Sequence, residues 1–458
     1  MELQRVFELK RGECVALTGA GGKTSLMAAL ADSWPGPVIL TTSTHLSAWQ
    51  VSVAQKHLIL TPDEDLSNLI PESFHTLLVT GPVGQDERLA GLVPRQLEAL
   101  SRICRAQGIP LLIEADGARQ RNLKAPADHE PAVLEWVDRV IVVAGLHGVG
   151  QPLDESAVHR PERFAALSGV AMGDLITADA LIKVLKNKQG GLKRIPVGAK
   201  RTLFLNQAES PELLAEAEQI AEALLDDYQD VLIGSLQQPG ANGPIFSVHS
   251  PVAGVILAAG GSQRLGRPKQ LLDWRGQSFI AKVAQNALAA GLRPLIVVTG
   301  AESEAVSDAL AGLLVTIVHN PDWQAGQSTS LRAGLRGLPE DCRAALFLMS
   351  DQPQVSPDLI RSVVEAFYTR RLPIAAPRIA GRRANPVLFA REAFDALNTI
   401  RGDQGGRAVF NQFEVAWVDW DDERSALDVD DEAAYERLKR AYIKNEAEPD
   451  DRPSNSDD

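Results

Sequence analysis

A glycine-rich turn with basic residues follows an apolar run in the second half of the chain. After the apolar residues 255–259 come, at short intervals, Gly260, Gly261, Arg264, Gly266 and Lys269. Glycines allow backbone N–H groups to approach a phosphate chain without obstruction by side chains. A guanidinium and an ammonium can neutralise the charge of a triphosphate. The pattern predicts a phosphate-binding loop with Arg264 and Lys269 as catalytic cations; a tight turn with solvated cations is the alternative.

Acidic residues in the same half could hold a metal ion. The apolar run "LFLMSDQPQV" (346–355) contains Asp351, and a carboxylate near a triphosphate is a natural Mg²⁺ ligand. Asp428 and Asp430 lie two residues apart before a helical pattern, so they share a face if that segment is extended. The alternative is that Asp428 and Asp431 cap the following helix.

Three further polar segments fall where strands are expected to end or helices to begin. Ser328, Thr329 and Ser330 open a helical pattern, and a helix N-terminus can bind an anion; plain N-capping is the alternative. The loops "GRRANPVLF" (381–389) and "GDQGGRAVF" (402–410) are polar and contain glycine.

A second glycine-rich turn lies near the start of the chain. In "TGAGGKTSL" (18–26), Lys23 and Thr24 follow glycines between an apolar run and a helical pattern, which is a P-loop context. The lysine would reach the β- and γ-phosphates and the threonine would bind Mg²⁺. The complete P-loop spacing is absent because Leu17 stands where that motif requires a glycine. A shorter form of the motif, which begins at Gly19 and includes Gly22, is present. A structural glycine turn is the alternative.

Residues at later strand ends support nucleotide binding in this half. Glu114 and Asp116 end an apolar run as a Walker-B acidic group does, and Asn206 ends another run where base-reading loops often carry Asn-Lys-x-Asp. Gln207 and Glu209 replace the lysine and the aspartate of that pattern, which argues against guanine selectivity.

Short apolar runs alternate with helical patterns along both halves of the chain, and these elements must position the residues named above. Such alternation predicts an α/β fold with parallel sheets, in which ligands bind at the carboxyl ends of the strands. The Gly-, Pro- and Asn-rich residues 236–251 predict a linker between two domains, residues 1–235 and 252–445. Six acidic residues and little apolar content predict a disordered tail, residues 446–458.

Composition excludes several classes of protein. The net charge of -13 disfavours nucleic acid as a partner. No apolar run approaches the roughly 18 residues of a membrane span, and the start of the chain lacks the apolar segment of a signal peptide, so we expect a cytoplasmic protein without a membrane partner. Cys14, Cys104 and Cys342 lie too far apart in sequence for a metal-ligand spacing, and we expect buried thiols.

The segment "LAAGGSQRLGRPK" (257–269) resembles the signature of the molybdenum cofactor nucleotidyltransferases, and residues 252–440 are similar to the cytidylyltransferase branch of that family. Guanylyltransferases of the family tend to have two glycines where this chain has Ala259-Gly260, which favours cytosine. The resemblance implies a Rossmann-like domain with Asp351 and Asp430, joined by Asp428, at the metal. It also implies that the nucleotide is bound by Leu257, Ala258, Ala259, Gly260, Gly261, Ser262, Gly266 and Ser330, and the pterin by Asn385, Asp403 and Arg407.

The reaction implied by this resemblance is transfer of CMP from CTP to molybdopterin or the molybdenum cofactor, with Mg²⁺ and with release of pyrophosphate. The attacking phosphate is already an anion, so no general base is required, and catalysis rests on alignment and charge neutralisation. Two alternatives remain: a nucleotidyltransferase for GTP or another phosphate acceptor, and a non-catalytic carrier that inserts the cofactor.

Residues 1–235 resemble the selenium-dependent hydroxylase accessory proteins through "LTGAGGKTS", "TTSTH", "IEADGARQRNLKAP" and "AGLHGVGQPL". The resemblance implies that both halves serve maturation of a client molybdenum hydroxylase. The P-loop pattern adds a second nucleotide, ATP or GTP, as a ligand of this half. Lys124, His147 and His159 lie in predicted loops and could line its site; a structural or surface role is the alternative for each histidine.

Overall fold

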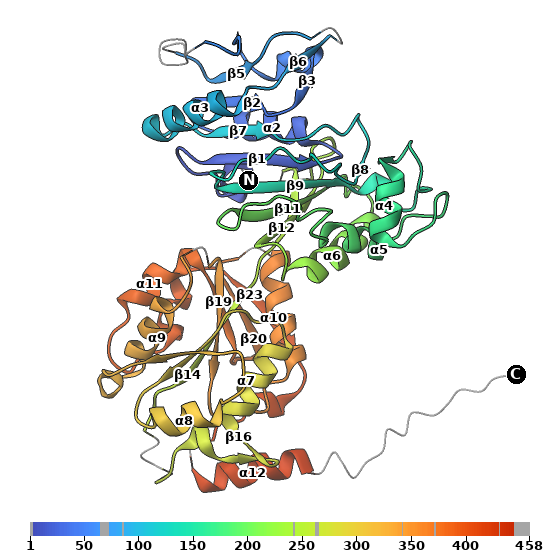
Figure 1. Ribbon diagram of the computed structural model, residues 1–458. Coiled ribbons are helices and arrows are strands. Elements are labelled where there is room, and N and C mark those ends of the chain that lie inside the picture. Colours follow the sequence, from blue (N-terminus) through green and yellow to red (C-terminus); the bar gives the residue numbers. More distant parts are fainter. Residues whose placement is uncertain are drawn as a thin grey trace, which may run out of the picture. The chain divides into compact units, whose positions relative to one another are not determined.

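The computed structural model describes residues 3–64, 73–84, 87–240, 243–261, 265–340, 342–370, 372–429 and 431–443. The chain divides into two compact units, Met1–Ser250 and Pro251–Asp458 (Figure 1). The predicted tail, residues 446–458, lies outside the described residues. Among the described helices, none combines the length and apolar character that a membrane crossing requires.

The first unit is built on a mainly parallel sheet with the strand order β13-β12-β11-β9-β1-β7-β2-β5-β4. Its strands are β1 (Cys14–Gly19), β2 (Val38–Thr42), β4 (Lys56–Ile59), β5 (Thr76–Thr80), β7 (Leu111–Glu114), β9 (Arg139–Gly145), β11 (Lys200–Asn206), β12 (Asp230–Gly234) and β13 (Ile245–His249). Alternate residues of β1 pack into different core clusters, Ala16 in one and Val15 and Leu17 in the other. The central strands are therefore buried on both faces, as a parallel sheet requires.

Helices and two small ribbons complete the first unit. The helices are α1 (Leu3–Val6), α2 (Lys23–Ser33), α3 (Pro94–Gln107), α4 (Pro161–Ser168), α5 (Ala178–Leu185) and α6 (Pro211–Leu224). One ribbon pairs β3 (His45–Ser47) antiparallel with β6 (Arg88–Ala90), and the other pairs β8 (Leu123–Lys124) parallel with β10 (Val158–His159).

The predicted linker, residues 236–251, is wrong in its second part. Residues 245–249 form β13, which pairs antiparallel with β12 at the edge of the first sheet. The pattern of β13 explains this position, because its residues alternate between buried and half-buried. Such alternation is typical of a strand with one covered face.

The second unit contains a mixed sheet with the order β18-β17-β14-β19-β22-β20-β21, and β23 also pairs with β20. Its strands are β14 (Ala253–Ala258), β17 (Leu295–Thr299), β18 (Thr316–His319), β19 (Ala344–Met349), β20 (Ile374–Ile379), β21 (Arg382–Arg383), β22 (Val387–Ala390) and β23 (Val415–Trp420). The strands around β14 are parallel, whereas β22 runs antiparallel to β19 and β20.

Helices cover this sheet too, as the alternation of patterns predicts. They are α7 (Phe279–Ala289), α8 (Ser303–Ala309), α9 (Gln327–Arg336), α10 (Pro357–Arg370), α11 (Phe394–Thr399) and α12 (Glu432–Ile443), and β15 (Asp273–Trp274) and β16 (Gln277–Ser278) form a short ribbon. Val255 and Ile256 on β14 point into different core clusters. Both units are therefore α/β folds whose central strands end at polar loops. The three cysteines are buried free thiols, as expected.

Candidate functional site

A pocket of about 750 Å³ opens at the carboxyl ends of β14 and β19 in the second unit. These strands are parallel neighbours, with Leu257 opposite Met349, so the loops that follow them meet at the same edge of the sheet. Of the predicted residues, those that line this pocket are Leu257, Ala259, Gly260, Gly261, Lys269, Ser330, Asp351 and Asp403. Residues predicted from separate motifs thus line one cavity.

Lys269 and Asp351 are oppositely charged residues of this pocket, which also contains Asp403. Lys269 begins a short 3-10 helix, Lys269–Leu271, and Asp351 follows β19. The ammonium Nζ lies 3.8 Å from Asp351 Oδ2, and the side chains are 16% and 21% exposed. Both groups are therefore partly desolvated and still open to a ligand.

The glycine loop is held against an aromatic side chain. A Cβ atom on Gly261 would lie 3.0 Å from a ring carbon of Trp323, so this position has room for glycine alone unless the indole moves. Gly266 has a φ of 71°, in the left-handed region that favours glycine. Ala258 is buried in the core and is not among the lining residues. Ser262 and Arg264 lie outside the described residues.

The start of α9 uses most of its hydroxyl groups for its own structure. Asn320 Nδ2 donates to Thr329 Oγ1 and Ser330 Oγ at 2.8 and 3.0 Å, and Thr329 Oγ1 donates to the carbonyl of Gly326. The backbone N–H of Gln327 donates to Asp403 Oδ1 at 3.4 Å. Asp403 therefore lies at the helix N-terminus as well as in the pocket. The N-cap residue of α9, Gly326, makes no side-chain cap hydrogen bond, and Ser330 lines the pocket.

The acidic residues fit a divalent cation only in part. Gln352 Nε2 donates to Asp428 Oδ1 at 2.6 Å, which brings Asp428 near the residue that follows Asp351. Asp431 Oδ1 accepts from the N–H of Ala434 and caps α12, whereas Asp430 lies outside the described residues. No group of three or more potential ligands occurs among the residues described. Mg²⁺ commonly takes one or two carboxylates together with substrate phosphates, so Asp351 and Asp428 are a donor set of the right chemistry.

The remaining predicted substrate residues do not line this pocket. Asn385 lies between β21 and β22, and Arg407 is exposed on a 3-10 helix, Gly406–Gln412. Burial, followed by the charge of Arg407, lowers the pKa of Arg383, whose guanidinium lies 4.5 Å from the ring centre of Phe410. A cationic surface at these loops is present, but the pocket contains only Asp403 of the predicted pterin residues.

Trp323 and Gln327 are among the lining residues that the motifs did not indicate. Trp323 and Gln327 come from the loop and helix start that carry the hydroxyl cluster. An indole can stack on a base or a pterin ring. The signal was present in "NPDWQAGQ", where an aromatic residue stands between a proline and a glycine in an expected loop.

The P-loop context of the first unit has the predicted local structure. β1 ends at Gly19 and α2 begins at Lys23, and Gly19, Gly21 and Gly22 have φ values of 92°, 83° and 130°. A Cβ atom on Gly19 would lie 2.2 Å from the carbonyl oxygen of Val143. Gly22, Lys23 and Thr24 line a pocket of about 620 Å³, and Gly19 does not.

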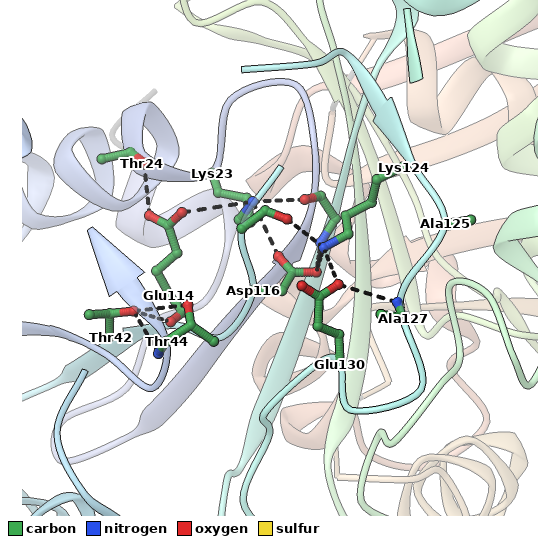
Figure 2. A network of polar contacts seen from close by, with 12 residues as sticks. Lys23, Thr24, Thr42, Thr44, Glu114, Asp116, Lys124, Ala125, Ala127 and Glu130 are labelled. Atoms are coloured by element: carbon green, nitrogen blue, oxygen red, sulfur yellow. Dashed lines mark hydrogen bonds and ion pairs between the residues drawn. The ribbon is translucent and has the colours of Figure 1, made fainter. Parts of the chain in front are cut away.

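Lys23 is buried among carboxylates (Figure 2). Its Nζ donates to the carbonyl of Gly19 at 2.7 Å and lies 3.2 Å from Asp116 Oδ1 and 3.8 Å from Glu114 Oε1. Burial acts to lower the pKa of Lys23, but the two carboxylates outweigh it and raise the pKa. Thr24 Oγ1 donates to Glu114 Oε2 at 2.8 Å, and burial raises the pKa of this glutamate. The predicted acidic pair therefore faces the predicted lysine and threonine.

The ion pairs continue beyond Asp116. Its Oδ2 accepts from the N–H of Gly19 at 3.1 Å and lies 2.9 Å from Lys124 Nζ, which in turn lies 2.9 Å from Glu130 Oε2. Arg160 donates to both oxygens of Glu130, at 2.7 and 3.0 Å. Lys124 is thus a buried member of the chain of charges seen in Figure 2 and does not line the large pocket. Glu130 and Arg160 were not indicated by the motifs.

The other candidates of the first unit have different surroundings. Asn206 Nδ2 donates to the carbonyl of Gly21 at 2.7 Å and lines the pocket. His147 Nε2 contacts Glu209 on the surface, outside the lining. Burial, with the charges of Arg160 and Lys124, lowers the pKa of His159 to about 4. His147 thus has a side-chain partner, and His159 pairs through its backbone with Lys124 in the β8–β10 ribbon.

Comparisons with known families divide the chain at the same place as the fold. Residues 15–162 match the family described as YqeC protein, and residues 254–417 match the family described as the MobA-like NTP transferase domain. The chain is 30% identical over 237 residues to the uncharacterized protein YqeC of Escherichia coli, which covers 50% of this chain and 90% of that protein.

Relatives of the second half have different names. The nicotine blue oxidoreductase of Paenarthrobacter nicotinovorans is 32% identical over 189 residues, 39% of this chain and 92% of that protein. The molybdenum cofactor cytidylyltransferase of Escherichia coli is 32% identical over 111 residues, 24% of this chain and 56% of that protein.

Among solved structures, Rv0371c of Mycobacterium tuberculosis complexed with manganese is 29% identical, covers 42% of this chain and 100% of that chain, and has a TM-score of 0.36. The family matches and the YqeC and nicotine blue oxidoreductase relatives show that the chain belongs to the YqeC family in its N-terminal half and to the MobA-like nucleotidyltransferases in its C-terminal half.

Proposed function

We propose that the C-terminal domain, residues 252–445, transfers CMP from CTP to the terminal phosphate of molybdopterin or the molybdenum cofactor and releases pyrophosphate. The observation that carries this proposal is the pair Lys269 and Asp351 in a pocket walled by the Gly260-Gly261 loop. A nucleotidyltransferase needs backbone donors, a cation and a metal-binding carboxylate at one place. The proposal is supported by a glycine loop, an ammonium group and a carboxylate that line the same pocket.

The reaction needs little chemistry from the side chains. An oxygen of the acceptor phosphate attacks the α-phosphorus of CTP, the bond to the bridging oxygen breaks, and pyrophosphate leaves with the electron pair. Lys269 neutralises charge on the phosphates, and Asp351, with Asp428 and Asp430, is proposed to hold Mg²⁺. When bound there, the metal would reduce the negative charge of the phosphates. Arg264 is proposed as a second cation.

The pterin is proposed to bind on the side of Asp403, with Asn385 and Arg407 at its outer edge. Trp323 offers an aromatic face on the same wall. The preference for cytosine rests on Ala259-Gly260 and on the relative named molybdenum cofactor cytidylyltransferase. A client molybdenum hydroxylase would receive the product.

For the N-terminal domain, the first unit Met1–Ser250, we propose a site for ATP or GTP with Mg²⁺. It is supported by the glycine loop that ends in Lys23 and Thr24 and by Glu114, which contacts both residues. The threonine hydroxyl and this carboxylate are oxygen donors of the kind that Mg²⁺ prefers.

A nucleotide series tests base and acceptor choice. Purified chain and Mg²⁺ are incubated with molybdenum-loaded pterin and CTP, GTP, ATP or UTP in turn, and pyrophosphate release is recorded. Release with CTP alone supports the proposal, and release with GTP alone assigns the guanylyl alternative. A third outcome is that no nucleotide reacts and the Asp351→Ala variant still supports insertion of the cofactor into a hydroxylase. In that case the protein is a non-catalytic carrier and not a nucleotidyltransferase.

A further inference from the structure

The pocket of the first unit carries an excess of positive charge in an acidic chain. Its charged lining residues are Lys23, Arg88, Glu114, Arg119 and Arg121, with His45 beside them. The chain as a whole has a net charge of -13. A local cationic cavity within such a field favours an anionic ligand.

The order of strands gives this pocket two different sides. The loop after β1 lies in the middle, because β1 pairs with β9 on one side and β7 on the other. Asn206 ends β11, the strand beyond β9, and lines the pocket there with Gln207. His45 and Arg88 come from the β3–β6 ribbon, which follows β2 and β5 beyond β7. A nucleotide whose phosphates lie on the loop can place its nucleoside on the uncharged Asn206 side and leave the cationic side open.

Hydrogen bonds join the backbone of the β3–β6 ribbon, which carries Arg88, to Thr24. Arg88 pairs with Ser47 in the β3–β6 ribbon, and the N–H of Ser47 donates to Gln50 Oε1 at 2.7 Å. Gln50 Nε2 then donates to Thr24 Oγ1 at 2.6 Å. The strand that pairs with Arg88 is therefore joined through two hydrogen bonds to Thr24. Thr24 is the residue proposed to hold the metal at the end of the phosphate chain.

A second cationic wall follows β7. The N–H of Gly21 donates to the carbonyl of Arg121 at 3.0 Å, so this loop packs directly on the glycine loop. Arg119 and Gln120 have φ values of 48° and 58°, and consecutive left-handed residues are costly unless the surroundings require them. Arg119 is exposed at the pocket, where its guanidinium can reach a ligand.

We propose that this pocket holds a second, anionic substrate on the side of Arg88 and Arg119, next to the terminal phosphate of the bound nucleotide. The proposal rests on the nucleotide site proposed above. Its ligand class is a tetrahedral oxyanion, present either as a free ion or as the phosphate group of a larger substrate. Lys23 and a metal at Thr24 already serve the triphosphate, whereas the guanidinium groups offer the bidentate geometry that a further oxyanion takes.

Calorimetric titration of the full chain tests the proposal. The chain carries Lys269→Ala, which removes the cation of the C-terminal pocket. It is titrated with Mg·ADP, and then with inorganic phosphate or glycerol phosphate, each with and without saturating Mg·ADP. The test variants are Arg88→Gln and Arg119→Gln. The matched control is Arg102→Gln, an exposed arginine on α3 outside the pocket.

We expect Arg88→Gln and Arg119→Gln to weaken phosphate binding by about tenfold or more and to change Mg·ADP affinity by less than about twofold, because they remove charge-assisted hydrogen bonds to the oxyanion only. Arg102→Gln should change neither affinity. Binding of both probes identifies a phosphorylated substrate, and binding of inorganic phosphate alone identifies a free oxyanion.

Two results would overturn the proposal. Equal weakening of Mg·ADP and phosphate binding would mean that the arginines serve the nucleotide itself. Absence of phosphate binding to the chain with intact arginines, in both conditions, would remove the second subsite. If phosphate binds but Mg·ADP does not, the nucleotide site fails and the oxyanion subsite stands, so the two failures are distinguishable.

Discussion

Asp116 joins two buried lysines of the first unit, with Oδ1 3.2 Å from Lys23 Nζ and Oδ2 2.9 Å from Lys124 Nζ. The side chains of Asp116 and Lys124 are each only 2% exposed. A buried charge that loses its partner destabilises a protein strongly, because the remaining charge is neither paired nor solvated. The Asp116 carboxylate therefore connects the glycine loop to the ion pairs that extend beyond Asp116.

Lys124→Met should destabilise the first unit by about 3–5 kcal/mol, since it leaves Asp116 and Glu130 short of a cation. Urea unfolding at pH 7 measures the loss. The double variant Lys124→Met with Glu130→Gln should recover part of it. Equal losses in the single and double variants would contradict the coupling of these two residues.

Glu130 makes part of this stability depend on pH. Burial acts to raise its pKa, but hydrogen bonds and charges from Arg160 and Lys124 outweigh burial and lower the pKa to about 2. A carboxyl with a depressed folded pKa contributes stability above its unfolded pKa of about 4.3, and that contribution is lost as pH falls towards 2. Its size is on the order of 3 kcal/mol.

Glu130→Gln should therefore be less stable than the wild type at pH 7, and the difference should shrink as the pH falls from about 5 to 2. Urea unfolding at a series of pH values measures it. A difference that stays constant over this range would show that the ionised carboxylate is not the source of the stability.

Gly19→Ala should cost about 3 kcal/mol or more, because the new methyl group would meet the carbonyl of Val143 and the backbone would remain in the left-handed region. Gly117→Ala is the matched control, since a Cβ atom there has no neighbour within 4 Å. The two variants are compared by urea unfolding. A stable Gly19→Ala protein would mean that the loop tolerates another path.

Lys23→Ala should abolish binding of Mg·ATP or Mg·GTP by the N-terminal domain and leave CTP-dependent transfer unchanged. Thr24→Ala should weaken nucleotide binding mainly in the presence of Mg²⁺, because it removes the proposed metal ligand. Calorimetry and the pyrophosphate assay are run on the same samples. Loss of CTP transfer in Lys23→Ala would show that the two domains are coupled in catalysis.

Local patterns predicted the fold class and both glycine loops, since a strand, a turn and a helix that are adjacent in sequence are positioned by their own residues. The edge strand β13 was missed because Gly, Pro and Asn residues precede it and its pairing with β12 depends on a long connection. The contacts of Glu130 with Lys124 and Arg160 were missed for a similar reason, because they form only when β8 and β10 pair.

The residues of the C-terminal pocket also divide into those that local sequence predicts and those whose positions depend on distant contacts. Asp351 and the glycine loop follow neighbouring parallel strands and were predictable from strand ends. Trp323 and Gln327 enter through a loop whose path depends on packing against Gly261 and Asp403. Asn385 and Arg407 were placed by resemblance alone, and they lie outside the pocket lining.

Lys269→Ala and Asp351→Ala should each reduce transferase activity by at least about a hundredfold, because catalysis by charge neutralisation depends on these two groups. Both variants should remain folded, since the side chains are partly exposed. Lys282→Ala, on α7 outside the pocket, is the control and should keep wild-type activity. A wild-type rate in either test variant would remove that residue from the site.

We propose that this chain attaches a cytidylyl group to a molybdenum-loaded pterin. The most direct measurement is the mass of the pterin product after incubation with CTP and Mg²⁺, with the Asp351→Ala chain in parallel. We predict a product heavier by one CMP unit, formed with pyrophosphate by the wild type and absent with Asp351→Ala. An unchanged pterin mass with the wild type, in a preparation that binds CTP, would contradict the claim.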